Sequence, residues 1–293
     1  MSRRLANVLI GLLLLGTATA TSYPLTVVDD LGREIVFAAA PTRIVSMLPS
    51  HTESVCALAA CDALVGVDRH SNYPAAVSAV TQLGDAFAPD LEALVALEPD
   101  LVLVDEYSGL QAPLAELGIA VYAGSPQSVA DTYAFLETLG RVLDRETEAA
   151  VLVGRLRGEI AGIAAVLADE VRPTVFVELD PTPYSVGPGS YLGELVTAAG
   201  GANIVTAAMG DFPQVDPEYV VLQDPEIVVL TDAPFGVTSA DVAARPGWDG
   251  VKAVVAGRVF ELDQAAADLL SRPGPRLAEA VEVLVRLFHP GKL

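Results

Sequence analysis

The chain carries the stretch Glu98-Pro-Asp-Leu-Val-Leu-Val104, and a similar stretch, Asp224-Pro-Glu-Ile-Val-Val-Leu230, follows in its second half. Each copy is preceded by a segment with helical character, Asp90-Leu-Glu-Ala-Leu-Val before the first and Asp216-Pro-Glu-Tyr-Val-Val before the second. An acidic residue and a proline are typical of a loop, and the short aliphatic run that follows them is typical of a buried parallel strand. The repetition predicts a duplicated α/β unit.

Strand-like and helix-like segments alternate on both sides of the two copies. Further buried strands are expected at residues 43–46, 64–67, 119–122, 174–177 and 259–260. A second echo pairs residues 59–63 with residues 198–202. The alternation predicts an α/β fold of two similar lobes, each with a central parallel sheet flanked by helices.

A long proline-free segment separates the two halves. Residues 147 to about 168 are rich in Ala, Leu, Val, Arg and Glu, and Arg172-Pro173 ends the helical pattern. We therefore expect an N-terminal lobe at 21–143, one rigid interlobe helix at 144–170 and a C-terminal lobe at 171–293.

The first twenty residues have the layout of a cleavable signal peptide. Arg3 and Arg4 precede an apolar run at residues 5–15, and Ala18-Thr-Ala20 is a small-residue cleavage pattern. The apolar run is shorter than the ~20 residues that a membrane-spanning helix needs. The sequence thus predicts export to the periplasm or another extracytoplasmic space.

The composition argues against several classes of function. The net charge of −21 repels nucleic acid, so we expect no nucleic-acid partner. The sequence has no Walker-type phosphate loop, no Gly-x-Ser-x-Gly motif and no His pair at metalloprotease spacing. Its three histidines are few and scattered. We expect a protein that is not an enzyme, with no catalytic residues, no cofactor and no metal held by protein side chains alone.

Two cysteines, Cys56 and Cys61, are the only ones in the chain. Export permits a disulfide. One regular helix would hold the two side chains in a poor geometry, whereas a chain that turns back after a helix end would bring them together. The sequence leaves both arrangements open. For the helix expected at residues 50–60, it predicts Ser50 as the N-cap and Glu53 as its capping-box partner.

The duplication places Glu92 and Glu218 at equivalent positions, each in the first turn of a short helix. Acidic residues there are favoured by the helix dipole, and this alone would explain them. Matched carboxylates on two similar lobes would also suit contact with a two-fold symmetric partner.

Taken together, these segments resemble the class III periplasmic substrate-binding proteins, the helical-backbone metal-receptor superfamily. The resemblance covers essentially the whole chain after residue 20 and implies a monomer that holds its ligand in a cleft between the lobes. It also implies that Glu92 and Glu218 dock onto arginines of a dimeric ABC permease with its ATPase subunits. The segments that carry the resemblance are Pro41-Thr-Arg-Ile-Val-Ser46, Asn72-Tyr-Pro74, Pro89-Asp-Leu-Glu92, Gly200-Gly-Ala-Asn-Ile204 and Gly257-Arg-Val-Phe260.

Two further stretches are similar to the corrinoid-binding members of that superfamily: Asp268-Leu-Leu-Ser-Arg272-Pro-Gly-Pro-Arg276 and Asp211-Phe-Pro-Gln-Val215. They imply a corrinoid, cobalamin or cobinamide, as the transported ligand. Such a flat amphipathic molecule needs aromatic surface and a few polar groups. The candidate ligand contacts that we expect on cleft-facing loops are His70, Tyr73, Phe87, Tyr107, Tyr184, Phe212, Asp268 and Arg272.

Several alternatives remain open at this stage. Asp268 and Arg272 also have the spacing of a helical ion pair. Phe212 stands where corrinoid binders tend to have Trp, and the single Trp248 lies in a stretch that we interpret as structural. His70 could be an axial ligand of corrinoid cobalt or haem iron. A ferric siderophore or haem is the alternative ligand, although only Arg69 and Arg272 offer positive charge near the cleft. An exported enzyme or sensor on the same fold is a third hypothesis.

Overall fold

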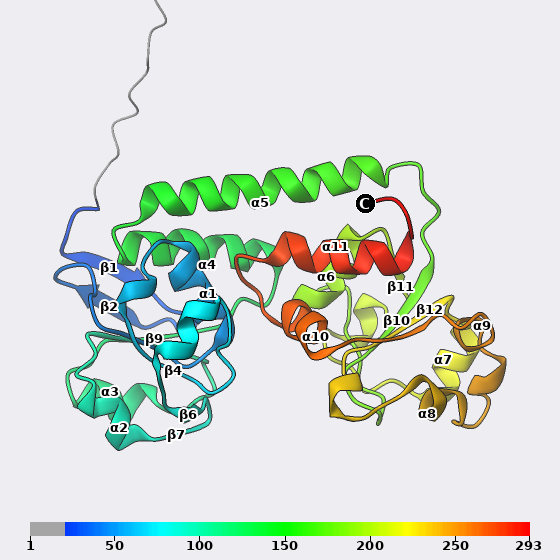
Figure 1. Cartoon of the computed structure of the whole chain (residues 1–293), viewed down its shortest axis with the longest axis horizontal. Coiled ribbons are helices and arrows are strands. Elements are labelled where there is room, and N and C mark those ends of the chain that lie inside the picture. The colour runs from blue at the N-terminus through cyan, green and yellow to red at the C-terminus, as the bar shows by residue number, and fades with distance from the viewer. Residues whose placement is uncertain (1–20) are drawn as a thin grey trace, which may run out of the picture.

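The computed structural model describes residues 21–293, and the expected signal peptide at residues 1–20 lies outside the described residues. Two parallel sheets lie side by side along the long axis, one in each half (Figure 1). The N-terminal sheet has the order β5-β4-β3-β8-β9, with bounds Thr81–Gln82, Leu64–Val67, Ile44–Ser46, Leu101–Val104 and Val121–Ala123. The C-terminal sheet has the order β11-β10-β12-β13, with bounds Ala202–Asn203, Thr174–Glu178, Ile227–Leu230 and Val259–Glu261. The predicted α/β fold with two parallel sheets is confirmed.

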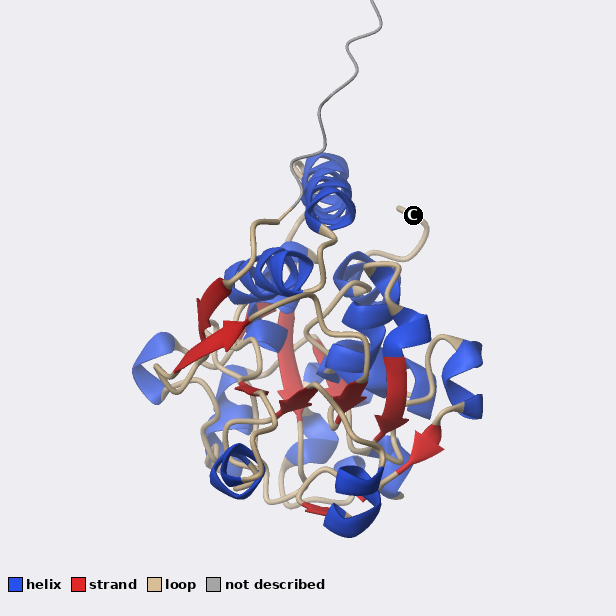
Figure 2. Ribbon diagram, turned by 90° about the vertical axis from the view of Figure 1, so that its left-hand side faces the viewer, coloured by secondary structure: helices blue, strands red, loops and turns tan. Residues whose placement is uncertain are grey.

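Two small antiparallel hairpins accompany the N-terminal sheet. They are β1–β2 (Leu25–Val28 and Glu34–Phe37) and β6–β7 (Gly84–Asp85 and Ala88–Pro89). Helices flank the strands on both sides, as Figure 2 shows. The helices of the N-terminal half are α1 Pro49–Ala57, α2 Leu91–Ala96, α3 Gln111–Glu116 and α4 Val129–Val142. Those of the C-terminal half are α6 Tyr191–Ala198, α7 Pro217–Gln223, α8 Ser239–Ala243, α9 Lys252–Val255, α10 Gln264–Ser271 and α11 Leu277–Phe288.

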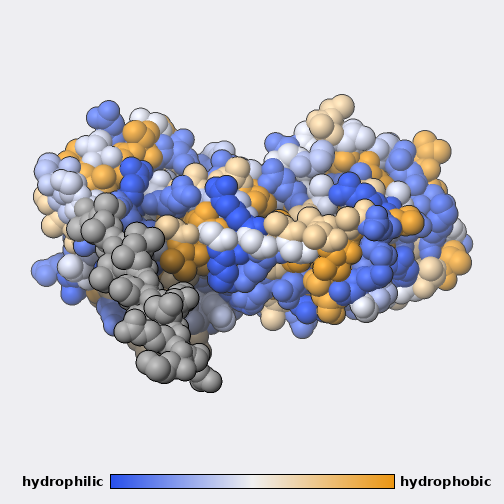
Figure 3. Space-filling view, turned by 90° about the horizontal axis from the view of Figure 1, so that it is seen from above, coloured by the Kyte–Doolittle hydropathy of each residue, from blue (hydrophilic) through white to orange (hydrophobic). Residues whose placement is uncertain are grey.

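The helix expected between the halves is α5, Glu146–Val166. It runs over α4 and α11 and reaches across both halves (Figure 1). Seen from the α5 side, hydrophobic and hydrophilic side chains are interspersed on the surface (Figure 3). Within residues 21–293, the structure has no helix of the length and apolarity that crossing a membrane requires.

The duplication read from the sequence is visible in the backbone. Glu98 and Asp224 have nearly equal positive φ angles, 47° and 48°, and each leads from a short helix into a strand. The strands that follow, β8 and β12, pair in parallel with β3 and β10, the first sheet strand of each half. The same local conformation therefore opens the same place in both sheets.

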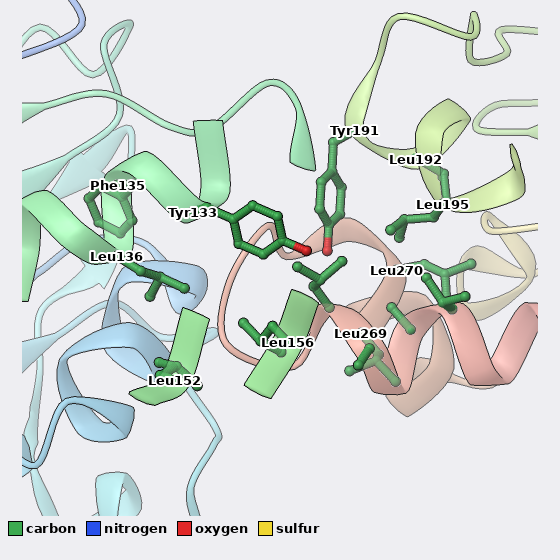
Figure 4. Packing of buried hydrophobic residues seen from close by; sticks show 14 of the residues in the cluster. Tyr133, Phe135, Leu136, Leu152, Leu156, Tyr191, Leu192, Leu195, Leu269 and Leu270 are labelled. Carbon is green, nitrogen blue, oxygen red and sulfur yellow. The ribbon is translucent and has the colours of Figure 1, made fainter. Parts of the chain in front are cut away.

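The main hydrophobic core runs through both halves. One cluster of buried side chains includes Ile44 and Leu101 of the N-terminal sheet together with Val175 and Ile227 of the C-terminal sheet. Figure 4 shows its middle, where side chains from α4, α5, α6 and α10 meet. Because the halves share this core, the lobe boundaries at 143 and 171 stay a prediction.

The start of α1 corrects one prediction. Pro49 occupies the first turn, Leu48 is the N-cap residue, and no side chain caps the helix. The predicted capping box of Ser50 and Glu53 is therefore wrong, and Glu53 instead pairs with Arg272. The other open question at this helix has a clear answer: Cys56 and Cys61 form a disulfide with an S–S distance of 2.10 Å. Cys61 begins a short 3-10 turn after the helix end.

Candidate functional site

A cavity of about 320 Å³ lies between the two halves. Its walls come from loops that follow β3, β8 and β9 on one side and β10 on the other. The residues that line it are Leu48, Ser50, Asp105, Ser125, Pro126, Gln127, Leu179, Val186, Tyr191, Leu192, Phe212, Leu270, Ser271 and Pro273.

The sheet topology explains why a cavity forms here. The strand order reverses between β3 and β8 in one sheet and between β10 and β12 in the other. At such switch points neighbouring loops leave in opposite directions and open a crevice at the carboxyl ends of the strands. Both sheets turn this edge toward the cavity.

The lining is mostly apolar, with a few hydroxyl and amide groups. Asp105 is its single charged residue, and no Lys, Arg or His stands among the described residues that line it. Tyr191 is buried, and this burial raises the pKa of its hydroxyl, which stays protonated and donates to the Arg272 carbonyl oxygen at 3.4 Å. Such a cavity suits a neutral ligand with hydrogen-bonding groups.

Of the predicted ligand contacts, Phe212 lines this cavity, and its side chain is 55% exposed. Tyr184 forms an isolated bridge with Gln214, close to Phe212. Tyr107 is 81% exposed, and its backbone N–H donates to the carboxylate of Asp105, a lining residue. These two aromatics lie beside the cavity without lining it.

The remaining aromatic candidates lie on the loop after β4 and in the turn between β6 and β7. Phe87, at the turn of that hairpin, is exposed. The guanidinium of Arg276 covers the ring of Tyr73 at 4.0 Å from its centroid. Arg69 donates from Nε to Nε2 of His70 at 3.0 Å and pairs with Asp85 at 2.9 Å. Axial ligation by His70 through Nε2 would require Arg69 to release that atom, so this role stays a prediction.

Asp268 and Arg272 form an ion pair at 2.6 Å across one helical turn. The structural interpretation of their spacing is therefore confirmed, whereas their contact with a ligand stays a prediction. Ser271 and Pro273, on either side of Arg272, line the cavity, but Arg272 itself points to protein partners.

Several residues that line the cavity were not among the predicted ligand contacts, for example Leu48, Ser50, Tyr191 and Leu192. Each lies in a loop or first helical turn that follows a predicted strand. This position is the feature of the sequence that could have indicated a place near the cavity. Aliphatic residues at such places look like ordinary core residues until the second sheet is placed opposite them.

The described residues contain no cluster of three His, Cys, Asp or Glu side chains suited to a metal ion. His51 is buried with its ring stacked on Phe135 at 4.6 Å between centroids. This burial lowers the pKa of His51 to about 3, and the imidazole is neutral at physiological pH.

The two predicted docking residues occupy matching positions. Glu92 of α2 and Glu218 of α7 are exposed in the first turns of their helices, which Asp90 and Asp216 cap through their side chains. Neither glutamate forms an ion pair with another described residue. Both carboxylates are available to a partner.

Residues 44–266 match the sequence model of the family described as periplasmic binding protein. The chain belongs to this family. It is 31% identical over 279 residues to the uncharacterized ABC transporter substrate-binding lipoprotein YvrC of Bacillus subtilis, covering 92% of this chain and 86% of YvrC. It is 30% identical over 285 residues to a cobalamin-binding protein of Halobacterium salinarum, covering 92% of this chain and 75% of that protein.

A similar solved structure is that of a possible iron-binding, periplasmic solute-binding protein from Staphylococcus epidermidis. The TM-score is 0.76 at 26% identity, and the match covers 86% of this chain and all 100% of the other. The family resemblance read from the sequence is confirmed, and the protein is a substrate-binding protein of the kind that serves ABC transporters.

Proposed function

We propose that this protein binds a corrinoid between its two halves, outside the cytoplasm, and delivers it to an ABC importer. The observation that carries the proposal is the cavity at the two switch points, whose lining is mostly apolar and includes no cationic side chain among the described residues. A corrinoid has an apolar ring edged by amide groups, which this lining matches. An anionic iron complex would require positive charge there. The cobalamin-binding relative of Halobacterium salinarum supports the same ligand class.

The size of the cavity has a consequence for how such a ligand would lie. About 320 Å³ is near the lower end of the range for small-molecule sites, roughly 300–1,000 Å³. A macrocycle would therefore extend from the cavity over the exposed aromatic side chains beside it, Phe212, Tyr107 and Tyr184. Aromatic faces pack well against a flat apolar ring.

The test is a titration of the purified chain, without residues 1–20, with cyanocobalamin, cobinamide, haemin and a ferric hydroxamate siderophore. We expect both corrinoids to bind and Phe212→Ala to weaken them about tenfold, because a packed aromatic contributes roughly 1–1.5 kcal/mol. Leu222→Ala, at an exposed position on α7 outside the cavity, is the control. Tight binding of another compound with no binding of either corrinoid would refute the ligand assignment.

A ferric siderophore or haem is the second candidate ligand. The exposed imidazole of His70, a potential axial ligand of haem iron, favours haem, and the Staphylococcus epidermidis relative is described as possibly iron-binding. If haem is the ligand, haemin will bind with a shift of its Soret band that His70→Ala abolishes.

Delivery requires contact with the permease, and we propose Glu92 and Glu218 as the docking residues. Their positions on α2 and α7 are related by the internal duplication, which suits a permease with two-fold symmetry. The variant with Glu92→Ala and Glu218→Ala should lose association with its permease, most clearly at low salt, and keep its ligand affinity. The matched control is Glu137→Ala with Glu148→Ala, two exposed glutamates on α4 and α5. Equal loss in both double variants, or loss of ligand binding, would contradict the assignment.

A further inference from the structure

Behind the cavity wall, four polar side chains from both halves form one hydrogen-bonded group, which we call the interlobe cluster: Glu53, Asn72, Asp268 and Arg272. Glu53 lies on α1, and Asn72 lies on the loop after β4. Asp268 and Arg272 lie on α10 and at its end, after the last strand of the C-terminal sheet. The cluster therefore links the two halves through residues that are far apart in the chain. Glu53 and Arg272, for example, are separated by 219 residues.

Arg272 is the centre of this cluster, and both terminal nitrogens of its guanidinium are fully engaged. Nη1 donates to Glu53 Oε1 and to Asn72 Oδ1, both at 2.8 Å. Nη2 donates to Asp268 Oδ2 at 2.6 Å and to the His70 carbonyl oxygen at 3.2 Å. The two terminal nitrogens carry four hydrogens, and the protein accepts all four. No terminal N–H remains for a ligand.

Both carboxylate oxygens of Asp268 also accept hydrogen bonds from protein groups. Its Oδ2 also accepts from Nδ2 of Asn72 at 3.1 Å, and its Oδ1 accepts from Nε2 of Gln264 at 2.7 Å. The side chains of Glu53 and Arg272 are only 3% and 8% exposed, so their pairing is little screened by water. Burial raises the pKa of Glu53, and the hydrogen bond from Arg272 opposes that rise.

The cluster stands directly behind residues that touch the cavity. Ser50 of α1, Tyr191 of α6, and Ser271 and Pro273 beside Arg272 all line it. The hydroxyl of Tyr191 donates to the carbonyl oxygen of Arg272. A shift of Arg272 would therefore move wall residues of both halves.

We propose that Arg272 is a positioning residue that holds α10 against α1 and the loop at 70–72, and thereby sets the cavity wall on which ligand retention depends. The inference rests on the proposed function in one respect, that the ligand occupies this cavity.

The experiment compares Arg272→Lys with Arg245→Lys, a matched control because Arg245 also pairs with a buried glutamate, Glu178. Lysine keeps the charge but cannot reach four acceptors with one ammonium group. Hydrogen exchange of the ligand-free protein is measured at residues 49–57, 68–74 and 264–271, and cyanocobalamin association and dissociation rates are measured separately.

In Arg272→Lys we expect exchange in all three segments and the dissociation rate to rise roughly tenfold, with little change in the association rate. In Arg245→Lys we expect exchange to rise only in the C-terminal sheet and the dissociation rate to stay within about twofold. Faster dissociation with unchanged exchange would mean direct ligand contact by Arg272 and would overturn the proposal. So would the absence of any change.

Glu53→Gln provides a second test, because Glu53 contacts Arg272 and does not line the cavity. It should reproduce faster exchange at 264–271 and faster ligand dissociation while the guanidinium is still present. If Glu53→Gln changes neither quantity, Arg272 does not act through this cluster. Exchange is measured without ligand, so a failure of corrinoids to bind would refute the proposed ligand and still leave the cluster tested.

Discussion

Two Arg–Glu pairs within residues 21–293 have a buried glutamate, and they have different consequences. Arg245 and Glu178 lie in the C-terminal half, 67 residues apart, and the guanidinium bonds both oxygens of one carboxylate while stacking on Trp248. Arg272 instead divides its donors among acceptors from both halves. The first arrangement concentrates two strong hydrogen bonds on one partner and stabilises one half. The second sets how the two halves lie against each other.

The main core extends this contrast. The outer parts of each half have their own clusters, and Trp248 belongs to the cluster of the C-terminal half. The residues near the cavity belong to the core that both halves share (Figure 4). Disturbing the Arg245 pair should therefore affect stability more than binding, and disturbing the Arg272 cluster should affect binding in addition.

The largest effect on stability is expected from Arg245→Met. It would leave Glu178, fully buried at 0% exposure, without its cation and close to the carboxylate of Asp232. Removing one partner of a buried pair lowers the free energy of unfolding by roughly 3–5 kcal/mol. Urea unfolding measures this change. A loss below about 1 kcal/mol would show that water already reaches this pair.

A smaller effect is expected when the disulfide is removed by Cys56→Ser with Cys61→Ser. Closing a loop this short contributes about 2 kcal/mol through the entropy of the unfolded chain. Because Cys56 lies in α1, one turn after Glu53, the loss should also speed hydrogen exchange in α1 and leave the Arg245 region unchanged. Thermal unfolding with and without reductant provides the measurement. If hydrogen exchange rose equally in α1 and around Arg245, the Arg272 cluster and the Arg245–Glu178 pair would not be independent of each other.

The smallest effect is expected from Asp232→Asn. Burial and the nearby carboxylates of Glu178 and Asp180 raise the pKa of Asp232 to about 6, while Arg245 opposes the rise. The folded state therefore binds this proton more tightly than the unfolded state, so the stabilisation is present below about pH 4 and is lost as the pH rises through about 6. At pH 7 the variant should be more stable than the wild type by on the order of 1 kcal/mol.

At pH 4 this difference should disappear, because Asp232 is then protonated in the folded wild type. Melting temperatures of both proteins across pH 4–8 check the prediction. A gain that is equal at both pH values would mean that a cause other than titration is responsible.

The sequence predicted the architecture well, for a physical reason. Buried parallel strands need continuous aliphatic runs, and β8 and β12 coincide with the aliphatic runs at residues 101–104 and 227–230 of the duplicated stretch. The helix α5 was predicted because a proline-free stretch of helix formers has few alternatives. These are local properties, and the sequence carries them directly.

The candidate site was predicted less completely. Phe212 lines the cavity, while other aromatic candidates lie beside it or are covered, as Arg276 covers Tyr73. Exposure of an aromatic residue on a loop can be inferred from the sequence, but its direction depends on how the loop is held. The predicted capping box at α1 was wrong because the carboxylate of Glu53 pairs with Arg272, 219 residues away.

The sequence by itself determined the strands, the long helix and the equivalence of Glu92 and Glu218, because these follow from periodicity and repetition along the chain. The family followed from the resemblance of several short segments to known members. Only the tertiary structure decided that Arg272 bonds to Glu53 and Asn72, that none of the described residues lining the cavity is cationic, and that the two halves share one core. These facts depend on which residues meet across two sheets. Residues that meet there are far apart in the sequence, and local preference contains no information about their distance.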